Sequence, residues 1–204
     1  DTSQLALRVT MDQLPPSTGL EPWLQDLAKA GVTILAIAPA QAPNSGTQEF
    51  NVETVRSVAV ETHRLGLLLW VVVDLHNGSG LDVRPEWMAT TRTTARSDDA
   101  SRASVDVAHP GYQTYREELV RRLVRAGCDG VLLAARSTAG FAEEFSDESR
   151  RLFSASFGLN GTLDPIVGST SLSDSKEEGR AAHYWRWVGW KAKSYAQWTV
   201  RLRK

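Results

Sequence analysis

The sequence predicts a parallel β/α fold, and three features carry this prediction. Short apolar runs alternate with amphipathic helical patterns, which is typical of parallel strands joined by crossover helices. The second and third runs are apolar almost throughout, as in strands that are buried on both faces. Three helical patterns end at a glycine one or two residues before the next strand, at Gly31, Gly66 and Gly127.

The predicted elements follow from the period of the apolar residues. Pro22 suits the first turn of the first helix, and Ser146 is the expected N-cap of the fourth. A long irregular stretch over residues 76–108 is of the length that is usually functional. We expect strands at residues 5–9, 32–38, 67–73 and 131–135, and helices at residues 21–30, 52–64, 112–126, 146–157 and 180–203.

A doubly wound sheet and a β/α barrel both fit this alternation. No glycine-rich nucleotide-binding motif follows any strand, so the parallel (β/α) barrel of TIM type is favoured. Only about four βα units are present. We expect one glycoside-hydrolase-like domain over residues 1–204, either the N-terminal half of a larger barrel or a half-barrel that self-association or a partner protein completes, since the edge would otherwise stay unpaired.

Composition excludes several classes of partner. The net charge is −1, so no basic field attracts nucleic acid or anionic lipid, and the basic residues near the C-terminus are interpreted as partners of a helix dipole (Lys191, Lys193, Arg201, Arg203 and Lys204). No apolar run has the length of a membrane span. Cys128 is the single cysteine and is expected to pack in the core. The chain begins at Asp1 rather than Met, which is typical after removal of a leader or a larger N-terminal region.

In a β/α barrel the chemistry lies at the carboxyl ends of the strands. Asp12 and Asp74 follow the first and third strands and are the candidate catalytic carboxylates; for Asp12 the alternative is a cap on the following loop. Trp70 and Trp87 are candidate sugar-stacking residues, although Trp87 could equally plug its own loop. The substrate-binding candidates are Trp70, His76, Trp87 and Arg136.

Other chemistries find less support in the sequence. No second His or Cys stands at ligand spacing from His76, so neither a metal nor another cofactor is expected. His109 precedes a helix and is interpreted as part of a turn. The acidic run at residues 143–148 is interpreted as a solvated surface, and no nucleophilic serine motif occurs.

These stretches together resemble the C-terminal glycoside-hydrolase-like barrel of the bacterial exopolysaccharide deacetylase PgaB and related glycosidase barrels. Trp70 matches a Trp of the family's third strand, and Asp12 matches the Asp that ends its first. The resemblance implies a periplasmic or extracellular barrel that holds and cleaves a poly-β-1,6-N-acetylglucosamine-type polymer of biofilms. It is carried by residues 7–12, 23–38, 67–75, 129–132, 145–159 and 185–203.

The chain departs from this family after the fourth strand. Where the family has an Asp-Asp pair, this sequence has Ala135 and Arg136, and a methyl group cannot replace a general acid. Three hypotheses follow: a non-catalytic glycan-binding barrel descended from a hydrolase, an active glycoside hydrolase, and a protein-interaction module of a secretion or surface assembly. The third predicts that Trp187 or Trp190 is exposed.

Overall fold

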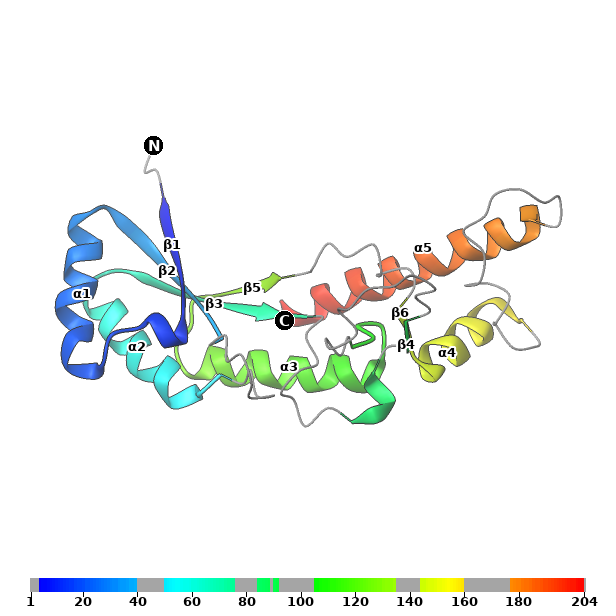
Figure 1. The fold of residues 1–204 in the computed structure, drawn as a ribbon, viewed down its shortest axis with the longest axis horizontal. Helices are drawn as coiled ribbons and strands as arrows, with labels where there is room; N and C mark the ends of the chain where they lie inside the picture. The colour runs from blue at the N-terminus through cyan, green and yellow to red at the C-terminus, as the bar shows by residue number, and fades with distance from the viewer. Residues whose placement is uncertain are drawn as a thin grey trace. The chain divides into compact units, whose positions relative to one another are not determined.

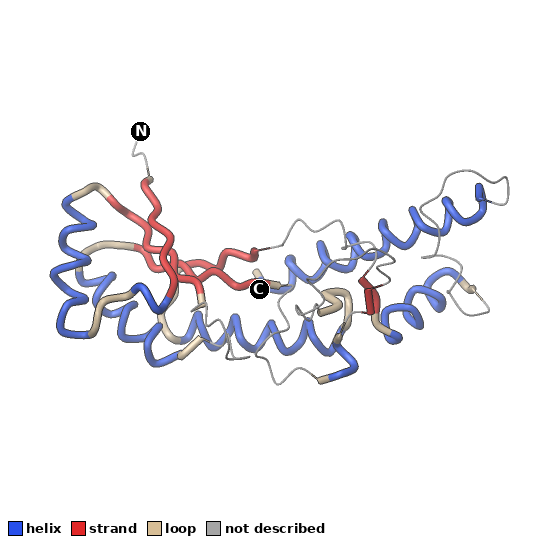
Figure 2. The backbone as a smooth tube through the Cα atoms, viewed as in Figure 1, coloured by secondary structure: helices blue, strands red, loops and turns tan. Residues whose placement is uncertain are grey.

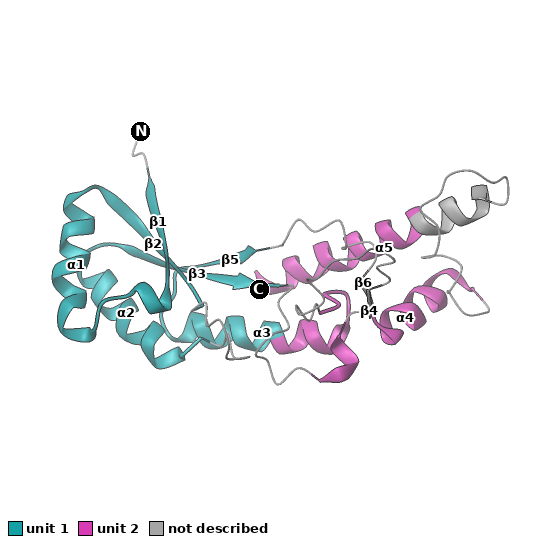
Figure 3. Ribbon diagram, in the orientation of Figure 1, with its two compact units in different colours: residues 1–75, 79–81, 116–135 teal, residues 76–78, 82–115, 136–204 magenta. Residues whose placement is uncertain are grey.

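A computed structural model describes residues 4–39, 50–75, 84–88, 90–91, 105–134, 144–159 and 177–203. These residues fall into two compact units, shown in two colours in Figure 3. Unit 1 comprises residues 1–75, 79–81 and 116–135, and unit 2 comprises residues 76–78, 82–115 and 136–204. The single domain expected over residues 1–204 stays a prediction.

The sheet of unit 1 contains four strands, β1 (Leu5–Thr10), β2 (Val32–Ala38), β3 (Leu68–Asp74) and β5 (Gly130–Ala134). All neighbouring pairs are parallel, and the strand order β1-β2-β3-β5 repeats the chain order (Figure 1). In a doubly wound sheet the order reverses at a switch point, which does not happen here. The predicted parallel barrel topology with four βα units is therefore confirmed.

Three helices connect these strands: α1 (Ser17–Lys29), α2 (Val52–Arg64) and α3 (Pro110–Arg125). The bounds of α2 are as predicted, but α1 begins four residues earlier than expected. Its first turn closes where the Gly19 N–H donates to the Pro16 carbonyl (2.8 Å), so Pro22 lies inside the helix rather than in its first turn. The Pro22 ring has no N–H, so α1 lacks one backbone hydrogen bond there.

The two faces of this sheet differ in what covers them. The helices α1 and α2 lie on one side of it (Figures 1 and 2), and the side chains that β2 and β3 place on that face are aliphatic and at most 1% exposed. On the other face Ala36, Ala38 and Val72 form a small buried cluster, which Trp70 partly covers. The helix-facing set is Leu35, Ile37, Leu69, Val71 and Val73.

Unit 2 contains the remaining elements. The 3-10 helix η2 (Pro85–Trp87) and the strand β4 (Thr90–Thr91) lie in the stretch that was predicted to be irregular. β4 pairs antiparallel with β6 (Glu144–Phe145). Glu144, one of the residues of the acidic run at 143–148, therefore lies in a short strand. Two helices complete the unit, α4 (Asp147–Phe157) and α5 (Glu177–Leu202).

A buried carboxylate lies at the centre of unit 2. Asp106 is 0% exposed and accepts hydrogen bonds from the backbone N–H of Ser146 (2.8 Å) and from the hydroxyl of Ser149. Its other oxygen accepts from the N–H of Ala108 (3.0 Å) and lies 3.5 Å from Nζ of Lys191. Lys191 is 1% exposed, so its interpretation as a helix-dipole partner near the C-terminus is wrong.

The tryptophans of α5 mostly pack inside unit 2. Trp187 is 2% exposed and stacks on Trp190 at a centroid distance of 5.4 Å, and both contact Phe153 of α4. Of the two tryptophans of which one was expected to be exposed, Trp187 is buried and Trp190 is only partly buried. Among the described helices, none is long and apolar enough to cross a membrane.

Candidate functional site at the carboxyl ends of the strands

The two predicted carboxylates lie at the same edge of the unit 1 sheet. Thr10 pairs with Ala38, and the β2–β3 register sets Ala38 beside Val72. Asp74 is the last residue of β3, and Asp12 lies in the turn of 3-10 helix that directly follows β1, so both acids lie at the carboxyl ends of their strands. Because adjacent strands lie about 4.8 Å apart, positions on β1 and β3 are separated by roughly 10 Å.

Asp74 lies at the end of β3, on the face opposite α1 and α2. Its side chain projects from the same face of the sheet as those of Trp70 and Val72 and is half-buried. The guanidinium of Arg116 donates to its backbone carbonyl (3.1 Å). One residue further, the N–H of Leu75 donates to the Ala134 carbonyl (3.1 Å), so this strand end is held from two sides.

Arg116 was not identified from the sequence, although a signal was present. It follows Tyr112 by four residues, which places it on the same face of α3, and it is only 5% exposed. A long cation on the buried face of a helix needs an acceptor, and here the Asp74 carbonyl is one. The spacing is a signal that could have identified a buried arginine, but not the strand end that it contacts.

Asp12 lies in the short 3-10 helix η1 (Met11–Gln13) and is exposed. Gln13 supplies a side-chain oxygen to the backbone N–H of Thr10 (2.9 Å) at the beginning of this helix. The helix thus obtains this hydrogen bond from Gln13, and Asp12 is an exposed residue next to the end of β1.

Trp70 lies on the same strand and the same face of the sheet as Asp74. Its indole packs on Ala36, Ala38 and Val72, and Gly130 on β5 lies directly beside it. A Cβ atom at position 130 would lie 2.9 Å from Nε1 of Trp70, so the glycine is what lets the ring lie across the sheet. The result is an apolar surface on the same face of the sheet as Asp74.

Arg8 is a second residue that sequence reasoning missed. It lies on β1 at the level of Ala36, on the same face as Trp70, and is exposed. Within the described part of the chain its side chain has neither a hydrogen bond nor an ion pair. No pattern in the sequence points to it, because a single arginine in a short strand does not reveal which face it occupies.

The other predicted site residues are placed differently. Trp87 belongs to unit 2, is 7% exposed and packs on Tyr112 and Tyr115, with ring centroids 6.0 and 5.3 Å away. This burial favours the alternative that Trp87 plugs its loop. His109 accepts a hydrogen bond from the Gly111 N–H (3.1 Å) at the beginning of α3, in keeping with a turn. His76, Ala135 and Arg136 lie outside the described residues.

The opposite edge of the sheet carries a different acid. Oδ2 of Asp129 accepts from the Leu69 N–H (2.7 Å) and lies 2.8 Å from Nε2 of His63. Burial acts to raise the pKa of Asp129, but the Leu69 N–H and His63 outweigh it and lower that pKa. At this edge the contacts tie α2, β3 and β5 together, which is a structural role.

Two further groups bear on the chemistry. Burial raises the pKa of the Cys128 thiol to about 11, so it stays protonated and unreactive at neutral pH. Among the residues that the structure describes, no group of three or more His, Cys, Asp or Glu side chains is placed to hold a metal ion.

Comparison with known proteins shows the fold and no closer kinship. No family model matches the sequence, and no curated protein matches it. Among solved structures, an α-galactosidase from Lactobacillus brevis aligns with a TM-score of 0.57 at 11% identity, over 98% of this chain and 26% of its own. A noncanonic maltogenic α-amylase, AmyB from Thermotoga neapolitana, aligns with a TM-score of 0.52 at 14% identity, over 69% of this chain and 41% of its own.

The fold is a truncated TIM-type barrel. The chain spans less than half of either of these glycoside hydrolases. A hypothetical protein from Ruminiclostridium thermocellum aligns with a TM-score of 0.50 at 10% identity, over 92% of this chain and 91% of its own. The predicted resemblance to glycoside-hydrolase barrels is thus supported at the level of fold.

Proposed function

We propose that this chain is a glycan-binding barrel derived from a glycoside hydrolase, with impaired or absent catalysis. The observation that carries the proposal is the placement of Asp12 and Asp74 at one edge of the sheet, with the indole of Trp70 on the same face of the sheet as Asp74. Carboxylates hydrogen-bond sugar hydroxyls, and an aromatic ring packs against the apolar face of a pyranose. The fold shared with glycoside hydrolases supports the same class of ligand.

The ligand that we propose is an amino-sugar exopolysaccharide, bound in the periplasm or outside the cell. This rests on the resemblance of the sequence to the exopolysaccharide deacetylase barrel, including the positions of Asp12 and Trp70. His76 and Arg136 follow the third and fourth strands and are proposed to bind the same ligand. Trp87 is the weakest member of the predicted set, because its ring is buried in unit 2.

Binding is tested with the 204-residue chain and β-1,6-linked N-acetylglucosamine oligomers by calorimetry. We expect Trp70→Ala to weaken binding about tenfold or more through loss of the stacking surface, and Asp74→Asn to weaken it less. The matched control is Trp23→Ala on α1, at the far side of the sheet from Trp70. An equal loss in both tryptophan variants, or no binding by the parent chain, would contradict the proposal.

An active glycoside hydrolase is the second candidate. A separation of roughly 10 Å between β1 and β3 positions is close to the upper end of the range for inverting enzymes, about 6.5–9.5 Å between carboxyl groups. The missing acid after the fourth strand argues against it. Rapid release of shorter products that Asp74→Asn abolishes would establish this candidate instead.

We further propose that the open edges of the sheet are completed in the working protein. β1 and β5 each have one strand neighbour in the described residues, and Leu68 and Leu132 are both 39% exposed on the face that a full barrel would enclose. Self-association or a partner protein would cover this face. Sedimentation analysis decides between them, because only self-association raises the mass of the isolated chain.

A further inference from the structure

The last helix concentrates the positive charge of the chain. Residues 179–204 contain seven Arg and Lys and no Asp or Glu, whereas residues 1–178 contain sixteen basic and twenty-four acidic residues. The net charge of −1 is therefore the sum of an acidic excess over residues 1–178 and a basic excess over residues 179–204. Two of the seven cations have structural roles: Lys191 pairs with Asp106, and Arg201 donates to Oε1 of Gln113 (2.7 Å).

Three other cations, Arg186 and Lys193 of α5 and Arg203 just after it, are exposed. Their side chains form neither a hydrogen bond nor an ion pair within the described part of the chain. In the other helices most exposed cations pair with an acid three residues away, although Arg122 of α3 does not. These pairs are Lys29–Asp26, Arg56–Glu53, Arg64–Glu61, Arg121–Glu118 and Arg151–Glu148.

The three cations share one side of the helix. They lie on its exposed face together with small residues, Gly189 and Ala196, while Trp187, Lys191 and Trp198 are buried on the opposite face. Seventeen residues separate Arg186 from Arg203, so the charged face is roughly 25 Å long. The cations are spread along a surface of small side chains and do not converge on one point. This spacing suits an extended ligand better than a small anion.

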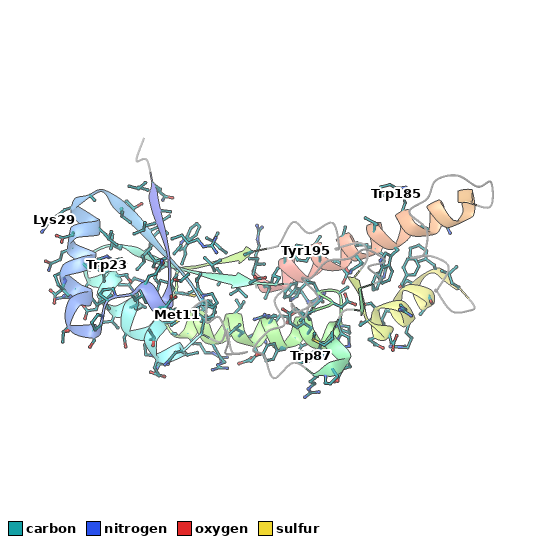
Figure 4. All side chains as sticks on the ribbon, viewed as in Figure 1. Met11, Trp23, Lys29, Trp87, Trp185 and Tyr195 are labelled. Carbon is teal, nitrogen blue, oxygen red and sulfur yellow. The ribbon has the colours of Figure 1, made fainter. Side chains whose placement is uncertain are left out.

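An aromatic ring adjoins this face at its N-terminal end. Trp185 is 67% exposed and projects from α5 away from α4 in Figure 4. Trp87, also labelled there, is by contrast buried beside α3. An exposed indole next to cations combines a stacking surface for sugar rings with charge for their carboxylates.

We propose that the exposed face of α5, formed by Trp185, Arg186 and Lys193 and extended by Arg203 just after the helix, binds an acidic polysaccharide. This surface lies in unit 2 and differs from the sugar site proposed at the strand ends of unit 1. The cations complement the carboxylates of the polymer, and the small residues between them let the chain lie close to the helix.

Two other anionic partners fit less well. A membrane surface would take up an apolar helix face, but that face of α5 already packs on Phe153 and carries Trp187 and Trp198 inside the unit. Nucleic acid has a denser negative charge, which the acidic excess over residues 1–178 opposes. An acidic polysaccharide whose charges are uronate carboxylates carries about one charge per sugar and offers pyranose faces to Trp185.

The test uses polygalacturonate and the whole chain, with affinity measured at about 20 and 150 mM salt. We expect the triple variant Arg186→Gln/Lys193→Gln/Arg203→Gln to bind about tenfold more weakly at low salt, with a smaller salt dependence. The control Lys29→Gln/Arg56→Gln/Arg151→Gln makes the same change in net charge at paired cations and should bind within about twofold of the parent. Trp185→Ala should weaken binding at both salt concentrations, because stacking is not screened.

The outcomes separate this proposal from its rivals. Equal losses in the two triple variants would show attraction by net charge alone and overturn it, as would the absence of polygalacturonate binding by the parent. Tighter binding to single-stranded DNA or to phosphatidylserine vesicles would assign the face to those partners. Binding of neutral amino-sugar oligomers should not change in the α5 variant, so failure of the site in unit 1 is detected independently.

Discussion

Units 1 and 2 bury different kinds of side chain at their centres. In unit 1, Leu35, Leu69 and Val71 are 0% exposed beneath helices α1 and α2. In unit 2 the equally buried groups include Asp106 and Lys191, at 0% and 1% exposure, joined by a contact of 3.5 Å. The first centre gains stability from each apolar side chain, whereas the second depends on every polar group having its partner.

The consequence of this difference is unequal tolerance to substitution. An apolar layer loses the burial of one side chain and some packing when it is truncated. A buried ionic group that loses its partner leaves an uncompensated charge in the interior, which costs more than the pair contributed. The largest effects of single substitutions are therefore expected in unit 2.

The largest effect should come from Asp106→Ala. The change leaves Lys191 buried without its carboxylate and removes the acceptor for Ser146, so we expect a loss of about 3–5 kcal/mol in the free energy of unfolding. Urea unfolding followed by tryptophan fluorescence measures it, and hydrogen exchange assigns the loss to unit 2.

A double variant tests whether the unpaired charge is the cause. In Asp106→Leu/Lys191→Met both partners are apolar, and stability should recover relative to Asp106→Ala. If the double variant is as unstable as the single one, the hydrogen bonds that Asp106 accepts from backbone N–H groups contribute more to stability than the ion pair does. The contrast between the two units would then rest on hydrogen bonds rather than on charge.

Two helix caps provide a matched comparison between the units. Asn51 caps α2 in unit 1 by accepting from the N–H groups of Glu53 and Thr54 at an exposed position. Ser146 caps α4 in unit 2 through the Ser149 N–H, and it is 3% exposed. We expect Asn51→Ala to cost about 1 kcal/mol and Ser146→Ala about 2 kcal/mol, measured by urea unfolding.

Equal costs for the two caps would show that the surroundings of Ser146 add nothing to a normal cap. A larger cost for Asn51→Ala would reverse the proposed order of the units. Ser146→Thr is the control in unit 2, since it keeps the capping hydroxyl and should retain most of the stability.

The contrast between an apolar centre in unit 1 and a polar centre in unit 2 also explains which features the sequence could predict. The strands and helices of unit 1 follow from local patterns, such as the apolar run at residues 32–38, and β2 has the bounds that this run predicted. Asp12 and Asp74 were found because they follow such runs. The Asp106 contacts join residues forty positions apart, and the Gln113–Arg201 contact joins residues eighty-eight apart. No local period reports such partners, so Asp106, Arg8 and Arg116 were missed.

Two glycines, Gly130 in unit 1 and Gly189 in unit 2, extend the comparison to smaller changes in stability. Gly130→Ala on β5 adds a Cβ that would lie 2.9 Å from Nε1 of Trp70, so the indole must shift, at a cost of about 1 kcal/mol. Gly189→Ala on α5 meets nothing within 4 Å and should stabilise that helix by up to about 1 kcal/mol. Thermal unfolding measures both, and Trp70 fluorescence should change only in the first.

The smallest effect concerns pH and the edge of unit 1 opposite the candidate site. Burial acts to raise the pKa of Asp129, but the Leu69 N–H and His63 lower it below its usual value. A lowered pKa in the folded state stabilises the protein above the pKa of the unfolded chain, about 3.9, and this stabilisation is lost as the pH falls through the folded value. The side chains of His63 and Asp129 are 43% and 31% exposed, so the contribution should be below about 1 kcal/mol.

Asp129→Asn isolates this contribution because it keeps the shape of the side chain and removes its charge. The urea midpoint of the variant should lie below that of the parent at neutral pH, and the difference should shrink below about pH 4 as Asp129 becomes protonated. Asp147→Asn is the control, since Asp147 is fully exposed at 3.9 Å from Arg150. A difference that persists unchanged into acid would mean that the oxygen of Asp129, rather than its charge, holds the Leu69 N–H. In that case unit 1 would use hydrogen bonding without charge where unit 2 uses a buried ion pair.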